Sequence, residues 1–163
     1  HEVTDQGVDA TLSLNLASVI YSNRAAVRAF MQDNRRGAVL NMASVLGSRP
    51  SPTYFATHVY AAAKAGIVGF TRSCAAKYAP LGIRFNVVSP GLVDTPMAKR
   101  AAGDDTIQAF IKTKQPLDGG RIGKPSDLDA AVVYLLSDDA CFVTGQELAI
   151  DGGWGVSDGQ RSD

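Results

Sequence analysis

Cysteine, histidine and tryptophan are all scarce in this chain, which has two, two and one of them in 163 residues. Cys74 and Cys141 are too few for a disulfide framework and both lie in apolar patterns, so we expect a reduced, cytoplasmic setting. No apolar run approaches the roughly 20 residues that a membrane-spanning helix needs. Net charge is also lacking, because sixteen basic and sixteen acidic residues cancel. We therefore expect no binding to nucleic acid or to an anionic membrane, and no metal site.

The chain does have enough apolar sequence for one domain with a core, since 45% of its residues are hydrophobic. Helical periodicity of the apolar residues predicts three long helices, at 8–33, 57–78 and 125–136. Ser126 is the expected N-cap of the third helix. Short apolar runs typical of strands buried on both faces occur at 38–43, 83–88 and 147–150. No internal repeat or linker divides the chain, so we expect residues 1–163 to form a single domain.

The order of these segments indicates the fold class. Helices that alternate with buried strands are typical of right-handed crossovers in a parallel sheet, which predicts an α/β fold with helices on both faces. Ligands of such sheets bind beyond the carboxyl ends of the strands. Ser44 follows the first predicted strand, and Pro90 and Gly91 follow the second. We therefore expect these residues at the ligand-binding edge.

Two segments are harder to interpret. Residues 92–125 have weak periodicity and many charges, which predicts a mobile excursion with one short helix near 106–112. Its apolar residues indicate a lid over the substrate: Met97, Ile107, Phe110 and Ile111. Trp154 is expected to pack, either inside the chain or at a subunit contact, and the tail beyond it is expected to be frayed.

Tyr60 and Lys64 are the most informative pair in the sequence. They are four residues apart in a predicted helix, so both lie on one helix face. A free tyrosine has a pKa near ~10, and a neighbouring ammonium group is expected to lower it far enough for proton exchange at neutral pH. Ser44 could hold a substrate oxygen near the Tyr60 hydroxyl. The alternatives are a surface tyrosine with a lysine that reaches to solvent, and a loop serine that caps the strand end.

Asn15 is an amide in the middle of an apolar helix face, where a polar group needs a partner. It either takes part in the same proton-handling site or is an ordinary buried asparagine bonded to backbone. His58 invites a different interpretation, a serine hydrolase built on Ser44 and His58. No G-x-S-x-G turn surrounds Ser44 and no acidic partner for His58 is evident, which argues against a hydrolase.

Five blocks in order carry a resemblance to a known family: the Asn of LSLNLAS, the Ser of VLNMAS, YAAAK, IRFNVVSPGLVDTPM, and GRIGKPSD…VYLLSDDACFVTGQELAIDGGW. Together they resemble the short-chain dehydrogenases/reductases over nearly the whole chain. The resemblance implies a doubly wound Rossmann-type sheet. It also implies an NAD- or NADP-dependent oxidoreductase that interconverts a secondary alcohol and a ketone. Small-molecule substrates and a homo-oligomer, dimer or tetramer, paired through the two long helices, are implied as well.

The resemblance also assigns roles. Tyr60 is the implied general acid/base, and Lys64 is also a partner of the nicotinamide ribose. Ser44 holds the substrate oxygen, and Asn15 holds a water that links Lys64 to solvent. The implied nicotinamide site consists of Pro90, Gly91, the backbone of Val93 and the hydroxyl of Thr95.

Two features depart from the family pattern. The glycine-rich T-G-x-x-x-G-x-G turn and the N-N-A-G motif do not occur in these 163 residues, so the chain resembles the carboxyl-terminal two thirds of a family member. We expect this partial domain, without the amino-terminal cofactor-binding segment, to bind cofactor weakly and to be inactive alone, with an apolar sheet edge exposed. The alternative is a non-enzymatic binding or oligomer-forming module. The gap of sixteen positions from Ser44 to Tyr60 is also slightly wider than in the family.

Overall fold

A computed structural model describes residues 1–160, with only the backbone of Met97, Arg100 and Ala102. Its three strands are β1 (Gly37–Met42), β2 (Ile83–Pro90) and β3 (Glu147–Ile150). Its α-helices are α1 (Asp5–Leu12), α2 (Ser18–Gln32), α3 (His58–Tyr78), α4 (Lys99–Ala102), α5 (Asp105–Lys114) and α6 (Asp129–Leu136). All three predicted strands and all three long predicted helices are therefore present, as is the short helix predicted near 106–112.

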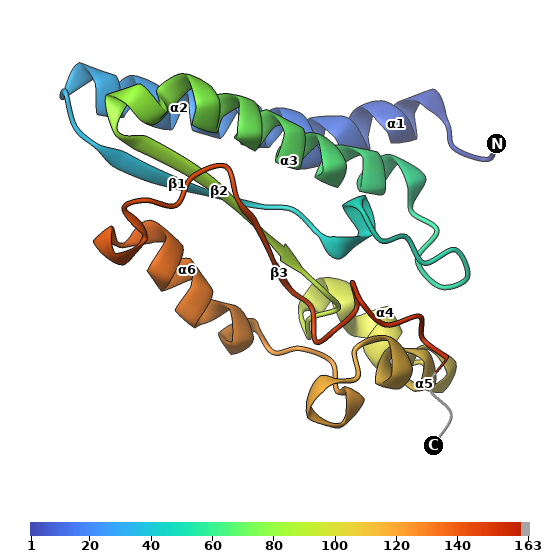
Figure 1. Ribbon diagram of the computed structural model, residues 1–163. Coiled ribbons are helices and arrows are strands. Elements are labelled where there is room, and N and C mark those ends of the chain that lie inside the picture. Colours follow the sequence, from blue (N-terminus) through green and yellow to red (C-terminus); the bar gives the residue numbers. More distant parts are fainter. Residues whose placement is uncertain (161–163) are drawn as a thin grey trace.

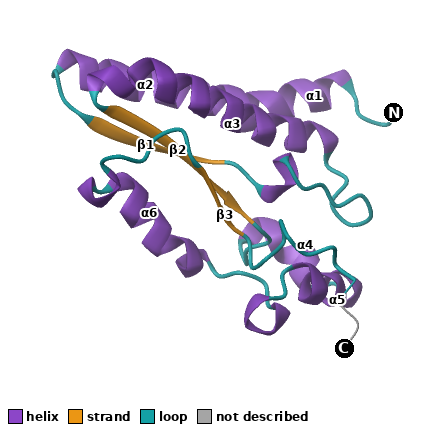
Figure 2. Ribbon diagram, viewed as in Figure 1, coloured by secondary structure: helices purple, strands orange, loops and turns teal. Residues whose placement is uncertain are grey.

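The sheet is parallel throughout, in the order β1-β2-β3. Gly37 pairs with Ile83 and Met42 with Val88 along the first ladder, and Val87 pairs with Glu147 at the start of the second. Helices α1, α2 and α3 cover one face, and α6 lies on the other (Figures 1 and 2). Helices α4 and α5 lie beyond the carboxyl ends of the strands, where the chain from Gly91 onward leaves the sheet (Figure 1). The predicted α/β fold with helices on both faces is confirmed.

The first long helix is not regular. A π-helical segment, Ser13–Ala17, joins α1 to α2, and the Ser18 N–H donates to the Ser13 carbonyl five residues back. Two side chains bond to carbonyls in this region: Asn15 Nδ2 donates to Thr11 O (3.0 Å) and Ser18 Oγ donates to Leu14 O (2.6 Å). Such side-chain bonds compete with the regular helical ladder. π-Helical turns are frequent at functional sites, and this one contains Asn15.

Three buried polar side chains connect the helical layer to the sheet. Asn41 on β1 exchanges two hydrogen bonds with Asn23 on α2 (2.8 and 2.9 Å), and its amide also donates to Thr71 on α3 (2.9 Å). All three are at most 5% exposed. Because buried amides are costly without partners, this network fixes the relative positions of α2, β1 and α3.

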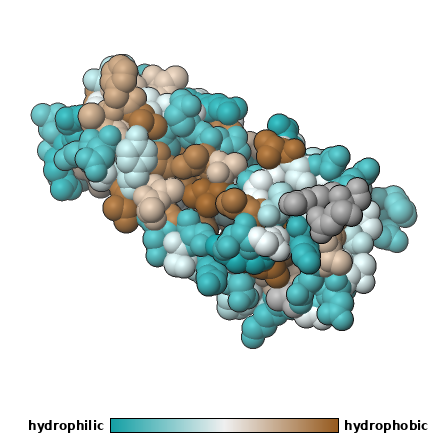
Figure 3. Space-filling model, turned by 60° about the horizontal axis from the view of Figure 1, so that its bottom comes forward, coloured by the Kyte–Doolittle hydropathy of each residue, from teal (hydrophilic) through white to brown (hydrophobic). Residues whose placement is uncertain are grey.

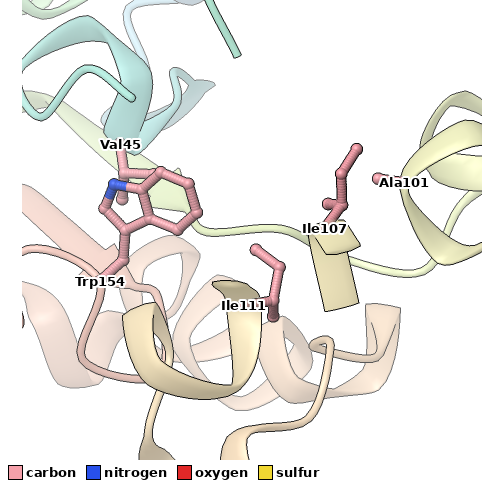
Figure 4. Close-up of a cluster of buried hydrophobic side chains, with 5 residues drawn as sticks. All are labelled: Val45, Ala101, Ile107, Ile111 and Trp154. Carbon is pink, nitrogen blue, oxygen red and sulfur yellow. The ribbon is translucent and has the colours of Figure 1, made fainter. Parts of the chain in front are cut away.

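Apolar packing is divided into separate clusters along the sheet. One lies under α2 and α3 around Val27, Ile83 and Phe85. Another lies beyond the strand ends, where Trp154 packs with Val45 and with α5 (Figure 4). Trp154 is 1% exposed and its Nε1 donates to Arg49 O (3.1 Å), so the expected packing role is confirmed within this chain.

Several details differ from the prediction. The turn into α6 starts at Pro125, and Lys124 is its N-cap, so Ser126 as N-cap was wrong; the Asp127 carboxylate instead accepts from the Lys124 N–H (2.7 Å). Helix α4 was not predicted, because four residues are too few for a periodic signal. The segment 155–160 is not frayed. Its Ser157 Oγ donates to Thr113 O (2.7 Å) and its Gly159 carbonyl accepts from Thr113 Oγ1 (2.9 Å), which ties the segment to α5.

Within residues 1–160, β1 pairs with β2 only, so its other edge is open. Met42 on this strand is 43% exposed. Large apolar side chains are also exposed on and after α6: Val133, Tyr134, Leu136, Phe142 and Leu148. Figure 3, which brings the α6 side forward, shows apolar side chains gathered along the middle of that face. No helix in the described part of the chain is both long and apolar enough to cross a bilayer.

Candidate active site

A cavity of about 710 Å³ lies at the carboxyl ends of β1 and β2. Seven of the eight predicted site residues line it: Ser44, Tyr60, Lys64, Pro90, Gly91, Val93 and Thr95. They come from three separate parts of the chain, the loop after β1, the first turns of α3 and the loop after β2. The parallel sheet brings them together because the carboxyl ends of neighbouring parallel strands meet at one edge.

Ser44 is positioned by the end of β1. Ala43 still bonds to the sheet, since its N–H donates to Val88 O (2.9 Å). Ser44 then adopts an extended conformation and caps a short 3₁₀ turn, with its Oγ accepting from the Leu46 N–H (3.2 Å). The expected strand-end cap is thus present. It does not exclude the second role, because the same side chain also hydrogen-bonds to Tyr60.

Gly47 holds this loop against α3. A Cβ atom at Gly47 would lie 2.9 Å from the backbone nitrogen of Ala65 and 3.2 Å from the Lys64 carbonyl carbon. Only a residue without a side chain allows this approach. The Ser44 loop therefore packs directly on the helix turn that carries Lys64.

Tyr60 and Lys64 point to a shared space, as predicted. Both are half-buried, both line the cavity, and Lys64 Nζ lies 5.4 Å from the centre of the Tyr60 ring. Lys64 Nζ also donates to Met42 O (3.1 Å) at the end of β1. The interpretation of Lys64 as a side chain that merely reaches to solvent is therefore wrong. Its ammonium group is held between β1 and the phenol ring.

The pKa of Tyr60 differs from the expectation. Burial raises the pKa of the Tyr60 phenol above its ordinary value, and the hydrogen bond with Ser44 opposes this only in part. Burial also lowers the pKa of Lys64. The expectation that Lys64 lowers the pKa of Tyr60 far enough for proton exchange at neutral pH was wrong, because loss of hydration disfavours the charged form of each group. At neutral pH Tyr60 is therefore a protonated phenol, and its raised pKa makes it a weaker acid than a free tyrosine.

Asn15 is the predicted residue that does not line the cavity in the described part of the chain. It is half-buried in the π-helical segment, which packs against α3, and its amide donates to the backbone of Thr11. This bond agrees with the alternative interpretation of Asn15, an ordinary asparagine bonded to backbone. Its proposed role in proton transfer stays a prediction.

The loop after β2 supplies backbone to the cavity. Gly91 N–H donates to Ile150 O (3.1 Å), which holds the loop beside β3. Val93 forms a parallel bridge with Gly123, in which Leu92 O and Asp94 N–H make the bonds (2.9 and 2.8 Å). The N–H and C=O of Val93 itself therefore point away from Gly123. Thr95 is extended and half-buried beside them.

Gln115 was not singled out in the sequence, although it is 2% exposed. Its Oε1 accepts from the Leu92 N–H (2.5 Å) and its Nε2 donates to Leu92 O (3.2 Å). A Cβ atom at Gly91 would lie 2.6 Å from the same Oε1. Gln115 thus fixes the peptide between Gly91 and Val93. No local signal marks it, because an isolated glutamine at a helix end is usually exposed.

The wide gap between Ser44 and Tyr60 is absorbed in the loop. Residues Ser51 and Phe55 form an antiparallel bridge that closes a small bulge, and Ser44 still bonds to Tyr60. His58 is exposed at the start of α3 and is not among the described lining residues. The hydrolase alternative therefore has no support from the geometry. Within residues 1–160, no three metal-ligating side chains gather.

Comparison with known proteins agrees with this geometry. Residues 1–155 match the family described as Enoyl-(Acyl carrier protein) reductase. The 2-(S)-hydroxypropyl-CoM dehydrogenase 3 of Xanthobacter autotrophicus is 40% identical over 157 residues, which cover 94% of this chain and 59% of that protein. The 3-oxoacyl-[acyl-carrier-protein] reductase of Vibrio harveyi is 37% identical over 142 residues, covering 87% of this chain and 55% of that protein.

A solved structure also resembles this chain over only part of its own length. The short-chain dehydrogenase of Leptospira borgpetersenii with bound NAD⁺ superposes with a TM-score of 0.86 at 33% identity, covering 95% of this chain and 59% of that one. The chain thus spans less than two thirds of the length of these relatives. With a family match over residues 1–155 and a fold that superposes on this solved structure, the chain belongs to the short-chain dehydrogenase/reductase family.

Proposed function

We propose that the protein containing this chain is a nicotinamide-dependent oxidoreductase that interconverts a secondary alcohol and a ketone. One observation carries the proposal: Ser44 bonds to Tyr60, and the Lys64 ammonium faces the same phenol, within a single cavity. Family membership supports it, since the relatives named above are a dehydrogenase, a reductase and a dehydrogenase with bound NAD⁺.

The residues at the end of β2 fit the nicotinamide end of NAD or NADP. The N–H and C=O of Val93 point away from its bridge, and the Thr95 hydroxyl is nearby, so donors and an acceptor suit a carboxamide. Gly91 and Pro90 offer a wall without a bulky side chain, and Lys64 can bond to a ribose hydroxyl. Nicotinamide supplies or accepts the hydride at its C4 when bound.

The chain's own residues handle the proton. Ser44 Oγ donates to the carbonyl oxygen and holds it beside Tyr60, within the ~3 Å that proton transfer needs. Tyr60 gives its proton to the oxygen as the alcohol forms, which its raised pKa allows at neutral pH. The Lys64 ammonium, 5.4 Å from the ring centre, stabilises the phenolate that remains. Asn15 is proposed to hold a water that returns the proton to Lys64.

The test is a comparison of two tyrosine variants in the protein that contains these residues. Tyr60→Phe removes the proton donor and should lower kcat for ketone reduction by about 100-fold or more. Tyr134→Phe is the matched control, because Tyr134 is 43% exposed on α6, is not among the described lining residues, and should keep wild-type rates. Steady-state oxidation of NADH or NADPH measures both. Undiminished turnover in Tyr60→Phe would remove the proposed acid/base role, whereas a wild type without turnover would favour the non-enzymatic alternative.

The 163 residues by themselves are proposed to bind cofactor weakly and to be inactive. They contain no glycine-rich turn, which in this family places backbone N–H groups at the pyrophosphate. Isothermal titration with NADH and NADPH checks this proposal, and micromolar binding by these residues alone would contradict it.

We also propose a homo-oligomer that pairs through the first long helix and α3. The first long helix carries large apolar side chains that are exposed: Leu14 (75%), Tyr21 (58%) and Met31 (55%). Sedimentation equilibrium of the wild type and of Leu14→Glu tests the proposal. A monomeric wild type, or a variant that assembles normally, would contradict it.

A further inference from the structure

One wall of the cavity is apolar and is built from four separate segments. We define this apolar wall by six lining residues that pack together: Val45, Leu46, Phe55, Leu92, Ala101 and Trp154. Ile107 and Ile111 on α5 project toward the same cluster from behind (Figure 4). The Phe55 and Trp154 rings meet edge to face, with centres 5.8 Å apart. The wall is therefore a packed surface rather than a set of loose side chains.

Charged side chains are scarce among the described residues that line the cavity. Among the described lining residues, only Lys64 and Asp129 carry charge. Lys64 is already bonded to Met42 O and faces Tyr60, so it belongs to the reacting centre. Asp129 would repel an anion. None of the six residues of the apolar wall can pair with a carboxylate, sulfonate or phosphate group.

An anionic substituent placed against the six residues of the apolar wall would lose its hydration without gaining a partner there. Proteins that recognise carboxylates or phosphates supply Arg or Lys for that purpose, and an unpaired buried charge is strongly unfavourable. An apolar substituent would instead gain from leaving water. Given the proposed redox function, we propose that this cavity selects an uncharged secondary alcohol or ketone whose substituents are apolar, and rejects hydroxy or keto acids.

The test uses two ketones of similar shape, 4-methylcyclohexanone and 4-oxocyclohexanecarboxylate, which differ by a methyl and a carboxylate group. Trp154 is the single tryptophan of these 163 residues and lies in the apolar wall. In the protein that contains them, its indole emission should report binding without any turnover. We expect a dissociation constant for the neutral ketone about tenfold or more below that for the carboxylate at pH 7. Equal affinities, or tighter binding of the carboxylate, would overturn the proposal.

A charge placed in the wall should reverse the preference. Leu46→Arg adds a cation to the segment after Ser44, and it should bind the carboxylate more tightly than the neutral ketone. Leu81→Arg is the matched control, because Leu81 is 51% exposed just before β2, at the opposite end of the strand, and should leave both affinities unchanged. Circular dichroism checks the fold of both variants. If Leu46→Arg does not fold, Phe55→Lys makes the same test.

The outcomes separate this inference from the proposed function. If neither ketone is reduced but the neutral one binds more tightly, the redox function is wrong and the selectivity of the cavity is right. If both ketones are reduced with equal kcat/KM and bind equally, the redox function stands and the inference is wrong.

Discussion

Tyr60 is a phenol held between a hydroxyl group and an ammonium group, and its surroundings act on its pKa in opposite directions. Burial raises the pKa and the Ser44 hydrogen bond lowers it, with burial the larger effect. The spacing of Tyr60 and Lys64 in the sequence predicted that they share a helix face. The sequence could not predict which effect on the pKa of Tyr60 is larger, because the burial of Tyr60 depends on the loops after β1 and β2.

The pH dependence of the two reaction directions follows from this balance. Ketone reduction needs the protonated phenol and alcohol oxidation needs the phenolate. Because the pKa of Tyr60 is raised, we expect kcat/KM for oxidation to increase with pH through the alkaline range and that for reduction to decrease there. Ser44→Ala removes the bond that lowers the pKa of Tyr60, so its oxidation profile should move to higher pH. A profile that moves to lower pH would contradict the role of Ser44, and initial rates over an alkaline pH series measure it.

Gln115 is a residue outside the reacting centre for which we predict a cost in stability. Gln115→Leu keeps the volume but leaves the Leu92 N–H without its partner, while the Leu92 C=O keeps only its bond from the Gly123 N–H. This change should lower the free energy of unfolding by about 1–3 kcal/mol. Gln115→Glu should be rescued at low pH, because a protonated carboxyl can accept from the N–H and donate to the C=O as the amide does. Urea unfolding at two pH values distinguishes the variants. Equal losses of unfolding free energy for both variants at all pH values would contradict this role of the hydrogen bonds to Leu92.

At the scale of elements, the site depends on contacts between the β1–α3 loop and its helix. The strand run and the helix were both predictable, since their apolar patterns are regular. The contact of Gly47 with the backbone of Ala65 was not, because no local signal shows which glycine lies against a distant helix.

Gly47→Ala tests this contact. The new methyl group would lie 2.9 Å from the Ala65 nitrogen, so the loop must move away from α3. We expect a loss of about 1–3 kcal/mol in unfolding free energy and a fall in kcat larger than the change in KM for cofactor, because Ser44 moves relative to Tyr60. Gly69→Ala is the control on the same helix, since no atom lies within 4 Å of its added methyl. Unchanged kinetics in Gly47→Ala would contradict the positioning role.

At the scale of the whole molecule, the segment after β3 closes the cavity. Trp154 lies in the apolar wall, and residues beyond it bond to α5 through Ser157 and Gly159. Within residues 1–160, β1 also has an open edge and α6 has exposed apolar side chains. Open edges with apolar neighbours promote association of chains.

The contribution of the residues after Trp154 can be tested by ending the chain at Gly155. This removes the bonds of Ser157 and Gly159 to α5, so we expect a lower Tm and weaker binding of the neutral ketone at the cavity. Ser157→Ala, which loses the side-chain bonds to Thr113 O and Gly159 N–H, should show a smaller effect of the same sign. A shortened chain with unchanged Tm would show that the segment adds nothing. Differential scanning calorimetry makes the comparison.

The amino-acid sequence alone determined the fold class and pointed to seven residues that line the cavity. Periodicity is a local property, so it revealed the strands, the long helices and the shared face of Tyr60 and Lys64. Tertiary structure decided what depends on distant contacts: the raised pKa of Tyr60, the bonding of Gln115, the buried Trp154 and the position of Asn15 outside the cavity lining. These features arise where segments far apart in the chain remove each other from water, and such burial is not written in any one segment.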